Sequence, residues 1–293
     1  MKKILFVFLL SIFATNVFAG YGGYIGKYDN RRYAAPSEPE YVGLVRLTKG
    51  MDIVGTGVFV SENLILTNNH CAEACQSGCV ARFWDGSKYE TSNVKVVSVN
   101  PNDTPSSGSD WGLLVSDRVS NFYKPIAPVS TPGQVLRGGY GLLRVIEDDE
   151  IPLLKEVYSQ TKQEYKKECK KQTGMPYAEC INKKVDEKLE QMGKKPLFRD
   201  AGILKVQTCK IIGNYAENPK MLETDCDSSG GDSGAPLLRN GEIVGLNNSG
   251  FQTVFGKTEI GARAVKTETF YLYVQEMIKK YQEINALENG FTK

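Results

Sequence analysis

The sequence predicts an all-β protein with one inserted helical segment and a helix near its C-terminal end. Short runs of Val, Leu and Ile, bounded by Gly, Pro, Asn or Asp, follow one another through residues 41–146 and return after Gly202. Many short strands separated by turn residues are typical of a β-barrel or a β-sandwich. Residues 147–200, between the two β regions, are instead rich in charged helix formers.

The N-terminal residues have the pattern of an export signal. Two lysines precede an apolar run at residues 4–13, and Val-Phe-Ala at residues 17–19 suits a signal peptidase. A membrane anchor is the alternative, but the run is shorter than the ~20 residues of a spanning helix. We expect a signal peptide at residues 1–19 and a secreted or periplasmic mature protein. Residues 20–40 then form an extended lead segment or a propeptide.

The net charge and the composition argue against some classes of binding partner. The net charge is +2, which gives no reason to expect nucleic acid or an anionic membrane. We find no second apolar run that could span a membrane after the signal peptide. Seven cysteines in an exported chain indicate disulfides, and the odd number leaves at least one unpaired within the chain. His70 is the single histidine, so any imidazole chemistry must use it.

The predicted elements follow in order along the chain. Strand-like runs before the insert lie at residues 42–47, 53–60, 64–67, 94–99 and 112–115, and after it at residues 203–206, 235–238 and 243–246. Apolar residues with a helical period between residues 269 and 284 predict an amphipathic helix that packs on the body of the protein.

The insert at residues 147–200 predicts a charged helical hairpin. Its apolar residues have a loose helical period, and Gly-Met-Pro at residues 174–176 is a turn signal. Cys169 and Cys180 flank this turn, so a disulfide between them would join the two helices.

The most informative stretch is Gly-Gly-Asp-Ser-Gly-Ala-Pro at residues 230–236. A serine hydroxyl becomes an effective nucleophile when a base takes its proton, and the attacked carbonyl then needs N–H donors for its oxyanion. A glycine-rich turn can direct amides inward without side-chain clashes. Ser233 is therefore the candidate nucleophile, with the Gly231 and Ser233 amides as oxyanion donors. An ordinary Gly/Ser loop is the alternative, because short motifs also match by chance.

This stretch resembles the trypsin/chymotrypsin family, whose nucleophile lies in Gly-Asp-Ser-Gly-Gly-Pro; Ala235 replaces the second Gly. Leu-Thr-Asn-Asn-His-Cys, ending at Cys71, is similar to the family's Leu/Val-Thr-Ala-Ala-His-Cys. Ser-Asp-Trp-Gly-Leu-Leu-Val, which contains Asp110, is similar to the strand that carries the family's aspartate. The resemblance implies His70 as general base, Asp110 as its orienting group and Ser233 as nucleophile, in the order His, Asp, Ser.

Two other aspartates compete for the orienting role. Asp85 and Asp103 also lie between the histidine and the nucleophile, but neither is followed by an apolar strand that would hold it firmly. Asp110 itself has an alternative role as a turn cap.

The resemblance also implies the architecture of the chain. We expect two six-stranded antiparallel β-barrels of the chymotrypsin type over residues 41–293, with the helical hairpin inserted and a C-terminal helix. Residues 243–250 resemble the strand that binds the substrate backbone, where Asn248 and Gly250 stand in the region of the family's Ser-Trp-Gly. The implied mechanism calls for no metal and no organic cofactor.

Asp227 lies six residues before Ser233, where trypsins have the floor of the primary specificity pocket. A buried carboxylate demands a cationic partner, so cleavage after Arg or Lys is implied. The alternatives are that Asp227 is a turn residue, since Ser229 replaces a family cysteine nearby, or that the enzyme is a glutamyl-type endopeptidase. Cys209 and Cys226 are expected to pair across the loop that enters the site.

The activation route is left open by the sequence. The family's Ile-Val-Gly-Gly start is absent, although Asp232 keeps the carboxylate that in the family binds the freed N-terminal amine. Either cleavage near Arg32 creates a terminus that reaches Asp232, or this activation mechanism is lost.

Three cysteines follow the histidine, namely Cys71, Cys75 and Cys79. Two of them are expected to pair, and the sequence does not say which. The family partner of Cys71 would lie near residues 55–57, where no cysteine stands. A metal site is a weaker alternative, because the histidine is already used and exported thiols tend to oxidise.

These observations predict a secreted serine endopeptidase that hydrolyses polypeptide substrates through an acyl-enzyme. The alternative is a catalytically silent binding protein on a protease scaffold. In the family, the loop that holds the insert flanks the leaving-group side of the cleft. The insert at residues 147–200 is therefore either an exosite for substrate or partner, or a solvated decoration.

Overall fold

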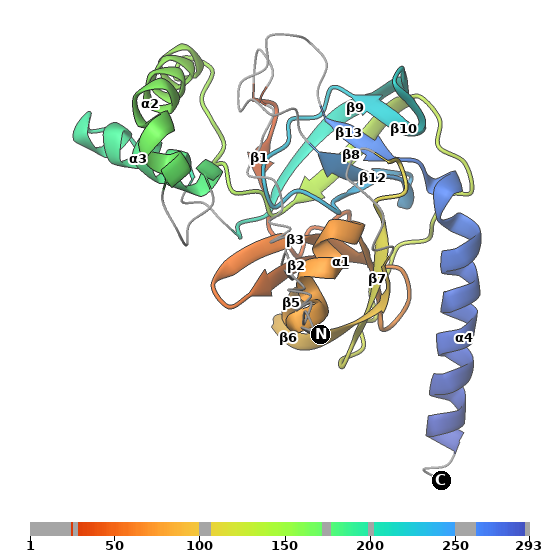
Figure 1. Cartoon of the computed structure of the whole chain (residues 1–293). Helices are drawn as coiled ribbons and strands as arrows, with labels where there is room; N and C mark the ends of the chain where they lie inside the picture. Colours follow the sequence, from red (N-terminus) through yellow and green to blue (C-terminus); the bar gives the residue numbers. More distant parts are fainter. Residues whose placement is uncertain are drawn as a thin grey trace, which may run out of the picture.

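The structure is a computed structural model that describes residues 25, 29–99, 107–171, 177–198, 202–249 and 262–290. The predicted signal peptide at residues 1–19 lies outside this described part. The described chain forms two antiparallel barrels, one above the other in Figure 1, with a helical insert on one side and a long C-terminal helix on the other.

The first barrel closes in the strand order β2-β3-β4-β7-β6-β5. Its strands are β2 (Leu44–Lys49), β3 (Asp52–Phe59), β4 (Leu64–Thr67), β5 (Cys79–Trp84), β6 (Tyr89–Ser98) and β7 (Gly112–Ser116). Alternate residues point inward, as the two-residue period of a strand requires. In β5, for example, Cys79, Ala81 and Phe83 are buried, and the Phe83 ring packs edge-on against Phe59 with centroids 4.8 Å apart.

The second barrel has the strand order β8-β9-β10-β13-β12-β11 and closes by pairing β8 with β9. Its strands are β8 (Gly133–Gly139), β9 (Lys205–Tyr215), β10 (Asn218–Thr224), β11 (Pro236–Arg239), β12 (Glu242–Ser249) and β13 (Arg263–Val265). The short strand β1 (Arg32–Tyr33), from the lead segment, pairs with the start of β9. The predicted pair of six-stranded antiparallel barrels is therefore confirmed.

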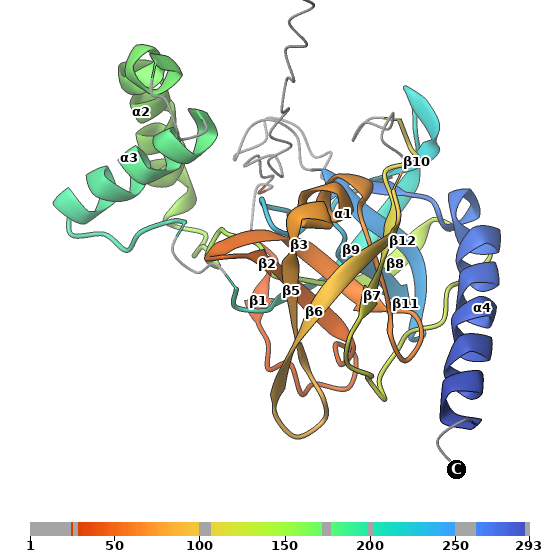
Figure 2. The same cartoon turned by 60° about the horizontal axis from the view of Figure 1, so that its bottom comes forward.

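One hydrophobic cluster joins the two barrels. Leu44, Val58 and Leu66 from the first barrel pack with Leu246 and Val265 from the second. The short helix α1 (Asn69–Ala74), followed by the 3₁₀ turn η1 (Cys75–Ser77), lies where the barrels meet in both views (Figures 1 and 2). Residues at the edges of this seam come from distant parts of the sequence, so the seam is where a composite site can form.

The inserted segment forms the predicted helical hairpin. Helix α2 (Ile151–Lys171) and helix α3 (Tyr177–Gln191) project away from the barrels, as Figures 1 and 2 both show. They share a hydrophobic cluster that includes Leu154 and Val185 together with Ile25, Leu143 and Leu197 of the adjoining chain, and the disulfide Cys169–Cys180 joins them. The predicted turn at residues 174–176 lies outside the described residues.

The C-terminal helix α4 (Tyr271–Gly290) is also present and follows the 3₁₀ turn η2 (Thr267–Thr269). It starts later and ends later than the residues 269–284 predicted from the sequence. Phe270, just before it, and Val274 within it are buried, and the Phe270 ring lies 6.0 Å from that of Trp111. Within the described residues, the helices are all too short or too polar to cross a membrane.

Candidate active site

His70 sits at the start of α1, directly after β4. The Asp110 carboxylate binds this residue twice: Oδ2 lies 2.7 Å from His70 Nδ1, and Oδ1 accepts the His70 backbone N–H at 3.0 Å. The Asn68 side-chain amide donates to the Asp110 carbonyl at 2.7 Å, which holds the aspartate from the other end. With the carboxylate accepting at Nδ1, the proton belongs on Nδ1, and Nε2 is free to act as a base.

The environment of His70 favours its charged form. Burial alone would lower the pKa of His70, but Cys71 and the Asp110 carboxylate together raise it well above its ordinary value. Both side chains of the pair are nearly inaccessible, with 7% of the imidazole and 1% of the Asp110 side chain exposed. A carboxylate this close stabilises the imidazolium that forms when a base accepts a proton.

The two competing aspartates are not at this site. Asp85 caps an exposed turn, where its Oδ1 accepts the backbone N–H groups of Ser87 at 2.7 Å and Lys88 at 2.8 Å. Asp103 lies outside the described residues. The structure therefore brings Asp110, rather than Asp85, to the histidine.

Ser233 approaches the same place from the second barrel. The Thr56 backbone N–H donates to the Ser233 carbonyl at 2.8 Å, and Cys71 Sγ lies 3.9 Å from that carbonyl. Gly234 has φ +81°, and a Cβ there would lie 3.1 Å from the Asn68 backbone nitrogen. The residue after Ser233 thus touches the residue two before His70, so the turn and the histidine lie together at the seam. This close approach also explains why Gly234 has to be glycine.

The Ser233 hydroxyl donates to the Asn248 carbonyl at 3.1 Å in this structure. This is a different partner from His70, which a serine nucleophile needs for proton transfer. Rotation about the serine χ1 angle would redirect the hydroxyl, and catalytic hydrogen bonds often tighten only when substrate is bound.

The backbone N–H groups of the turn around Ser233 fall into two groups: those that donate to a backbone carbonyl and those that do not. The Asp232 N–H donates to the Ser229 carbonyl at 2.9 Å, and the Gly234 N–H donates to the Asn247 carbonyl at 2.8 Å. Within the described residues, the N–H groups of Gly231 and Ser233 have no such acceptor. Gly231 has φ +91°, a conformation that glycine adopts without strain. The two amides expected to bind an oxyanion are therefore the two that remain unused.

Asp232 is paired inside the protein. Its Oδ2 lies 2.8 Å from Arg137 Nη2, with both side chains 1% exposed, and it also accepts the Ser229 N–H at 2.8 Å. Burial would raise the pKa of Asp232, but the charges of Arg137 and Arg31 lower it overall. In this structure, the Arg137 guanidinium thus pairs with the carboxylate that, in the family, binds the freed N-terminal amine.

Asp227 faces the lead segment. Its Oδ2 accepts the Asn30 N–H at 2.9 Å, and its carbonyl accepts from Gln207 Nε2 at 2.6 Å. The residue is 1% exposed. The next residue of the lead segment, Arg31, is also held inside the protein, where its buried guanidinium pairs with Asp29 at 2.7 Å. The predicted specificity residue is therefore covered by the lead segment in this conformation.

The cysteines form three disulfides: Cys75–Cys79, Cys169–Cys180 and Cys209–Cys226. The last two pairs were predicted. Cys71 is the free, buried thiol. A Cβ on Gly55 would lie 2.5 Å from Cys71 Sγ, so Gly55 stands where the family's partner cysteine would be.

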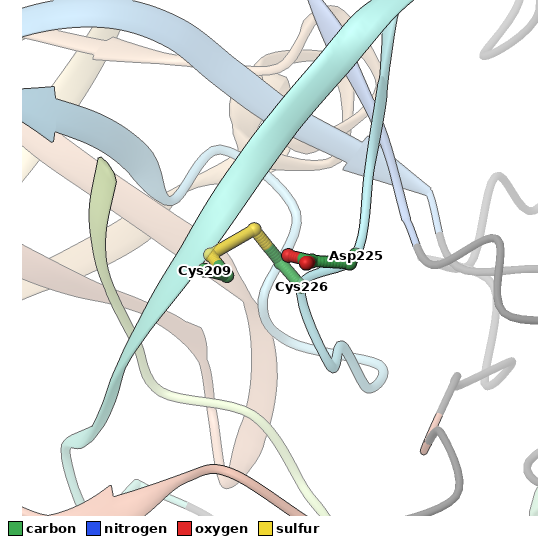
Figure 3. Close-up of side chains that lie close together, drawn as sticks. All are labelled: Cys209, Asp225 and Cys226. Atoms are coloured by element: carbon green, nitrogen blue, oxygen red, sulfur yellow. A yellow bond between two sulfur atoms is a disulfide. The ribbon is translucent and has the colours of Figure 1, made fainter. Parts of the chain in front are cut away.

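The sulfurs of Cys209 and Cys226 lie near the carboxylate of Asp225, a group that could hold a metal ion by position alone. Figure 3 shows that the two sulfurs are joined to each other. A disulfide sulfur is not the thiolate that a metal needs. The metal site considered for Cys71, Cys75 and Cys79 loses two of its thiols in the same way.

The predicted substrate-binding strand is only partly described. Asn248 is 1% exposed and uses its carbonyl for the Ser233 hydroxyl, while Gly250 lies outside the described residues. Its neighbour Asn247 supports the nucleophile turn instead, because its side-chain amide donates to the Asp232 carbonyl at 3.0 Å.

Sequence reasoning missed Arg137 and Thr56, which both hold the nucleophile turn. Thr56 Oγ1 donates to the Gly231 carbonyl at 2.8 Å. Arg137 carried one signal: it alternates with Val135 and Gly139 in the segment that forms β8, where a buried charge needs a partner. Thr56 carried no comparable signal, because threonine is common in strands.

Comparisons with known proteins agree with this geometry. The family described as the trypsin-like peptidase domain matches residues 55–246, well over half of the chain. The fold is similar to that of neuropsin, a serine protease expressed in the limbic system of mouse brain, with a TM-score of 0.54 and 15% sequence identity. That alignment covers 87% of this chain and 100% of neuropsin, and it is evidence for the fold. No curated protein matches the sequence. On the strength of the family match, the chain is a member of the trypsin-like peptidase family.

Proposed function

We propose that the protein is an exported serine endopeptidase that acts through an acyl-enzyme. The observation that carries this proposal is the 2.7 Å contact between His70 Nδ1 and Asp110, placed beside a turn in which the Gly231 and Ser233 amides are unused. The three disulfides favour an oxidising compartment, which agrees with a secreted or periplasmic protein.

In the proposed mechanism, Ser233 Oγ attacks the carbonyl carbon of the scissile peptide bond, and its proton passes to His70 Nε2. The Gly231 and Ser233 amides bind the resulting oxyanion, and each such donor contributes about 3–4 kcal/mol to transition-state stabilisation. The C–N bond then breaks as His70 returns the proton to the leaving amine. Water attacks the acyl-enzyme by the same route, which releases the acid and restores the serine.

Asp227 supports a preference for Arg or Lys, with one condition. Its carboxylate is a suitable partner for a cationic side chain, but it now accepts the Asn30 N–H. A basic substrate side chain would have to replace this contact. A lead segment that leaves Asp227 on cleavage would therefore increase cleavage after Arg and Lys, whereas a fixed segment would make Asp227 a structural residue. Cleavage of a peptide library by the full and truncated chains distinguishes the two, and also tests a glutamyl-type preference.

Active-site labelling tests whether the protein is an enzyme. A fluorophosphonate reacts with an activated serine, so we expect the wild-type protein to be labelled and Ser233→Ala to be unlabelled. Ser159→Ala is the control and should be labelled normally, because Ser159 is an exposed serine of helix α2 in the insert. Absence of labelling in the folded wild-type protein would refute the proposal.

That negative outcome would favour a binding protein on a protease scaffold. Two observations fit this second reading: the Ser233 hydroxyl points to Asn248 rather than to His70, and the hairpin of α2 and α3 projects from the barrels as a separate surface. The labelling experiment decides between the two functions.

A further inference from the structure

We propose that Arg46 and Arg82 form a binding site for an anionic oxygen group, either a carboxylate or a phosphate-type oxyanion. The site lies on the outer face of the first barrel, and its lining includes none of the proposed catalytic residues.

The two arginines face each other across neighbouring strands. Arg46 in β2 is the direct partner of Arg82 in β5. Directly opposite residues of an antiparallel pair point to the same face with Cβ atoms about 5 Å apart, and like charges in this position destabilise the sheet. Arg46 Nη1 donates to the Gly202 carbonyl at 3.3 Å, and the Arg82 guanidinium lies 4.2 Å from the centre of the Tyr89 ring. Neither arginine has a carboxylate partner among the described residues.

The guanidinium groups line a hollow of about 310 Å³. Its other walls are the rings of Tyr89 and Tyr140 and the chain at residues 34–36 and 202–204. The described lining contains no Asp or Glu, so its net charge is positive. A Cβ on Gly202 would collide with Arg46 Nη1, so this glycine keeps room for the guanidinium.

Arg46 is incompletely satisfied without a ligand. Its Nε is buried and has no hydrogen-bond partner in the described part of the chain. A buried donor without an acceptor costs free energy. Burial, and then the charge of Arg82, lowers the pKa of Arg46, which means that its charged form is less favourable here than in water. A bound anion would relieve the repulsion and supply an acceptor, as guanidinium groups do for carboxylates and phosphates.

The site is linked to the nucleophile turn through one strand. Arg46 is also the direct partner of Thr56 in β3, so Arg82, Arg46 and Thr56 form a row on one face. Thr56 Oγ1 donates to the Gly231 carbonyl at 2.8 Å and accepts the Tyr140 N–H at 3.0 Å. Tyr140 in turn lines the hollow. Thr56 and Tyr140 therefore connect the proposed anion site to the turn whose amides are proposed to bind the reaction's oxyanion. Either an acidic side chain of a bound polypeptide or a free phosphate-type anion would supply the anionic oxygen for the two arginines.

The first experiment measures anion binding without catalysis. Thermal unfolding of the Ser233→Ala protein is followed with inorganic phosphate and with sodium chloride at equal ionic strength. We expect phosphate to raise the Tm to a plateau, as a ligand of the native state does, and chloride to have a smaller effect. Arg46→Gln should weaken phosphate binding at least tenfold. Lys95→Gln, which removes an exposed charge from the same barrel, should leave it unchanged.

Charge reversal provides a second variant that should fold at least as well as the parent. Arg82→Glu places a carboxylate opposite Arg46, so we expect a higher Tm without phosphate and no further rise with it. The proposal is overturned if phosphate and chloride act alike on the Ser233→Ala protein, or if its phosphate response survives both Arg46→Gln and Arg82→Glu.

The second experiment identifies the source of the anion, and it rests on the proposed peptidase function. Peptide substrates carry Glu or Gln at successive positions on the leaving-group side. A KM at least fivefold lower for Glu, lost in Arg46→Gln without a matching change in kcat, assigns the site to substrate recognition. Equal KM values together with saturable phosphate binding assign it to a free oxyanion. Failure of peptide cleavage alone would refute the enzyme and leave the phosphate result standing.

Discussion

At the scale of single residues, the geometry around Asp110 governs the chemistry expected of His70. The carboxylate binds both the ring and the backbone of the histidine, which fixes the position of the imidazole as well as its tautomer. A general base works only when deprotonated. Because the pKa of His70 is raised, activity should increase with pH through a range well above that of an ordinary histidine.

Replacing Asp110 tests this arrangement. In Asp110→Asn, the carboxylate charge is lost while burial remains, so the pKa of His70 should fall. The turnover number should also fall by a factor of about 10⁴, because the amide no longer holds the productive tautomer. The chain has one histidine, so its ring resonances in an NMR titration are unambiguous. Asp85→Asn is the control and should change neither quantity. An unchanged His70 pKa in Asp110→Asn would contradict the assignment.

The buried pair of Arg137 and Asp232 gives a second prediction at this scale. Arg137→Met leaves a buried carboxylate unpaired and should lower the free energy of unfolding by about 3–5 kcal/mol near pH 7. The pKa of Asp232 is lower in the folded protein than in the unfolded chain. Its carboxylate therefore stabilises the fold at pH values above the unfolded pKa, and this contribution is lost as the pH falls through the folded pKa. The difference between wild type and variant should therefore shrink in acid.

Urea unfolding at pH 7 and at a pH well below 3.8, the ordinary pKa of an aspartate, measures this difference. Arg118→Met is the control, because Arg118 pairs with Glu90 at 3.2 Å on the surface with 60% of its side chain exposed. Such pairs contribute at most about 1 kcal/mol. An equal effect of both substitutions, or a difference that does not change with pH, would argue against a structural role of the buried pair.

At the scale of elements, local pattern predicted some strands and missed others. The apolar runs that became β4 and β7 were found, because both strands are almost continuously buried. β5 and β10 were missed: β5 alternates buried and half-buried residues, β10 mixes buried and exposed ones, and pairing with neighbouring strands makes both β-structure. β2 begins two residues later than predicted, directly after Gly43 with φ +94°.

The hairpin of α2 and α3 should behave as a separate element. Its disulfide closes a loop of 11 residues, for which loss of the crosslink costs about 3 kcal/mol in the chain-entropy account. In Cys169→Ser/Cys180→Ser, amide hydrogen exchange should speed up within residues 151–191. Because the hydrophobic cluster of the hairpin is separate from those of the barrels, exchange in the barrels and fluorophosphonate labelling should not change.

The Cys209–Cys226 disulfide provides the contrast. It joins β9 to the residue before Asp227, so Cys209→Ser/Cys226→Ser should slow fluorophosphonate labelling. If removal of the hairpin disulfide slowed labelling to the same degree, the insert would have to support the active site directly.

At the scale of the whole molecule, the site depends on how separate parts pack. The proposed catalytic residues come from both barrels, and the cluster between the barrels sets their relative position. The start of the C-terminal helix belongs to the same cluster, since Phe270 and Val274 pack there beside Trp111, the residue after Asp110.

Truncation of the buried ring should therefore affect the entire fold. Phe270 is 1% exposed, and Phe270→Ala should lower the free energy of unfolding by about 3–5 kcal/mol through lost burial and a cavity. Leu272 is 81% exposed, and Leu272→Ala should change the free energy of unfolding by no more than about 0.5 kcal/mol. Tryptophan fluorescence during urea unfolding reports both. Similar stability of the two variants would mean that the start of α4 does not contribute to the core.

Some features of the candidate site could be predicted from short stretches of sequence, and others depend on contacts between distant residues. The turn around Ser233, the segment around His70 and the strand start at Asp110 were recognised because each is a short stretch whose residue order carries the chemistry. The prediction of Cys209–Cys226 agrees with the structure, but which of Cys71, Cys75 and Cys79 would pair was open until the positions of all three were known.

The amino-acid sequence predicted the inserted hairpin by its periodicity, and its short motifs resemble the trypsin/chymotrypsin family, which implied the two barrels and the proposed catalytic residues. Periodicity and short motifs are properties of neighbouring residues, so they can be recognised without the fold. Only the tertiary structure decided that Arg137 pairs with Asp232, that the lead segment covers Asp227 and that Arg46 faces Arg82. These contacts join residues that are far apart in the chain. They depend on strand register and on how the barrels close, and a one-residue shift in register would turn each side chain to the opposite face.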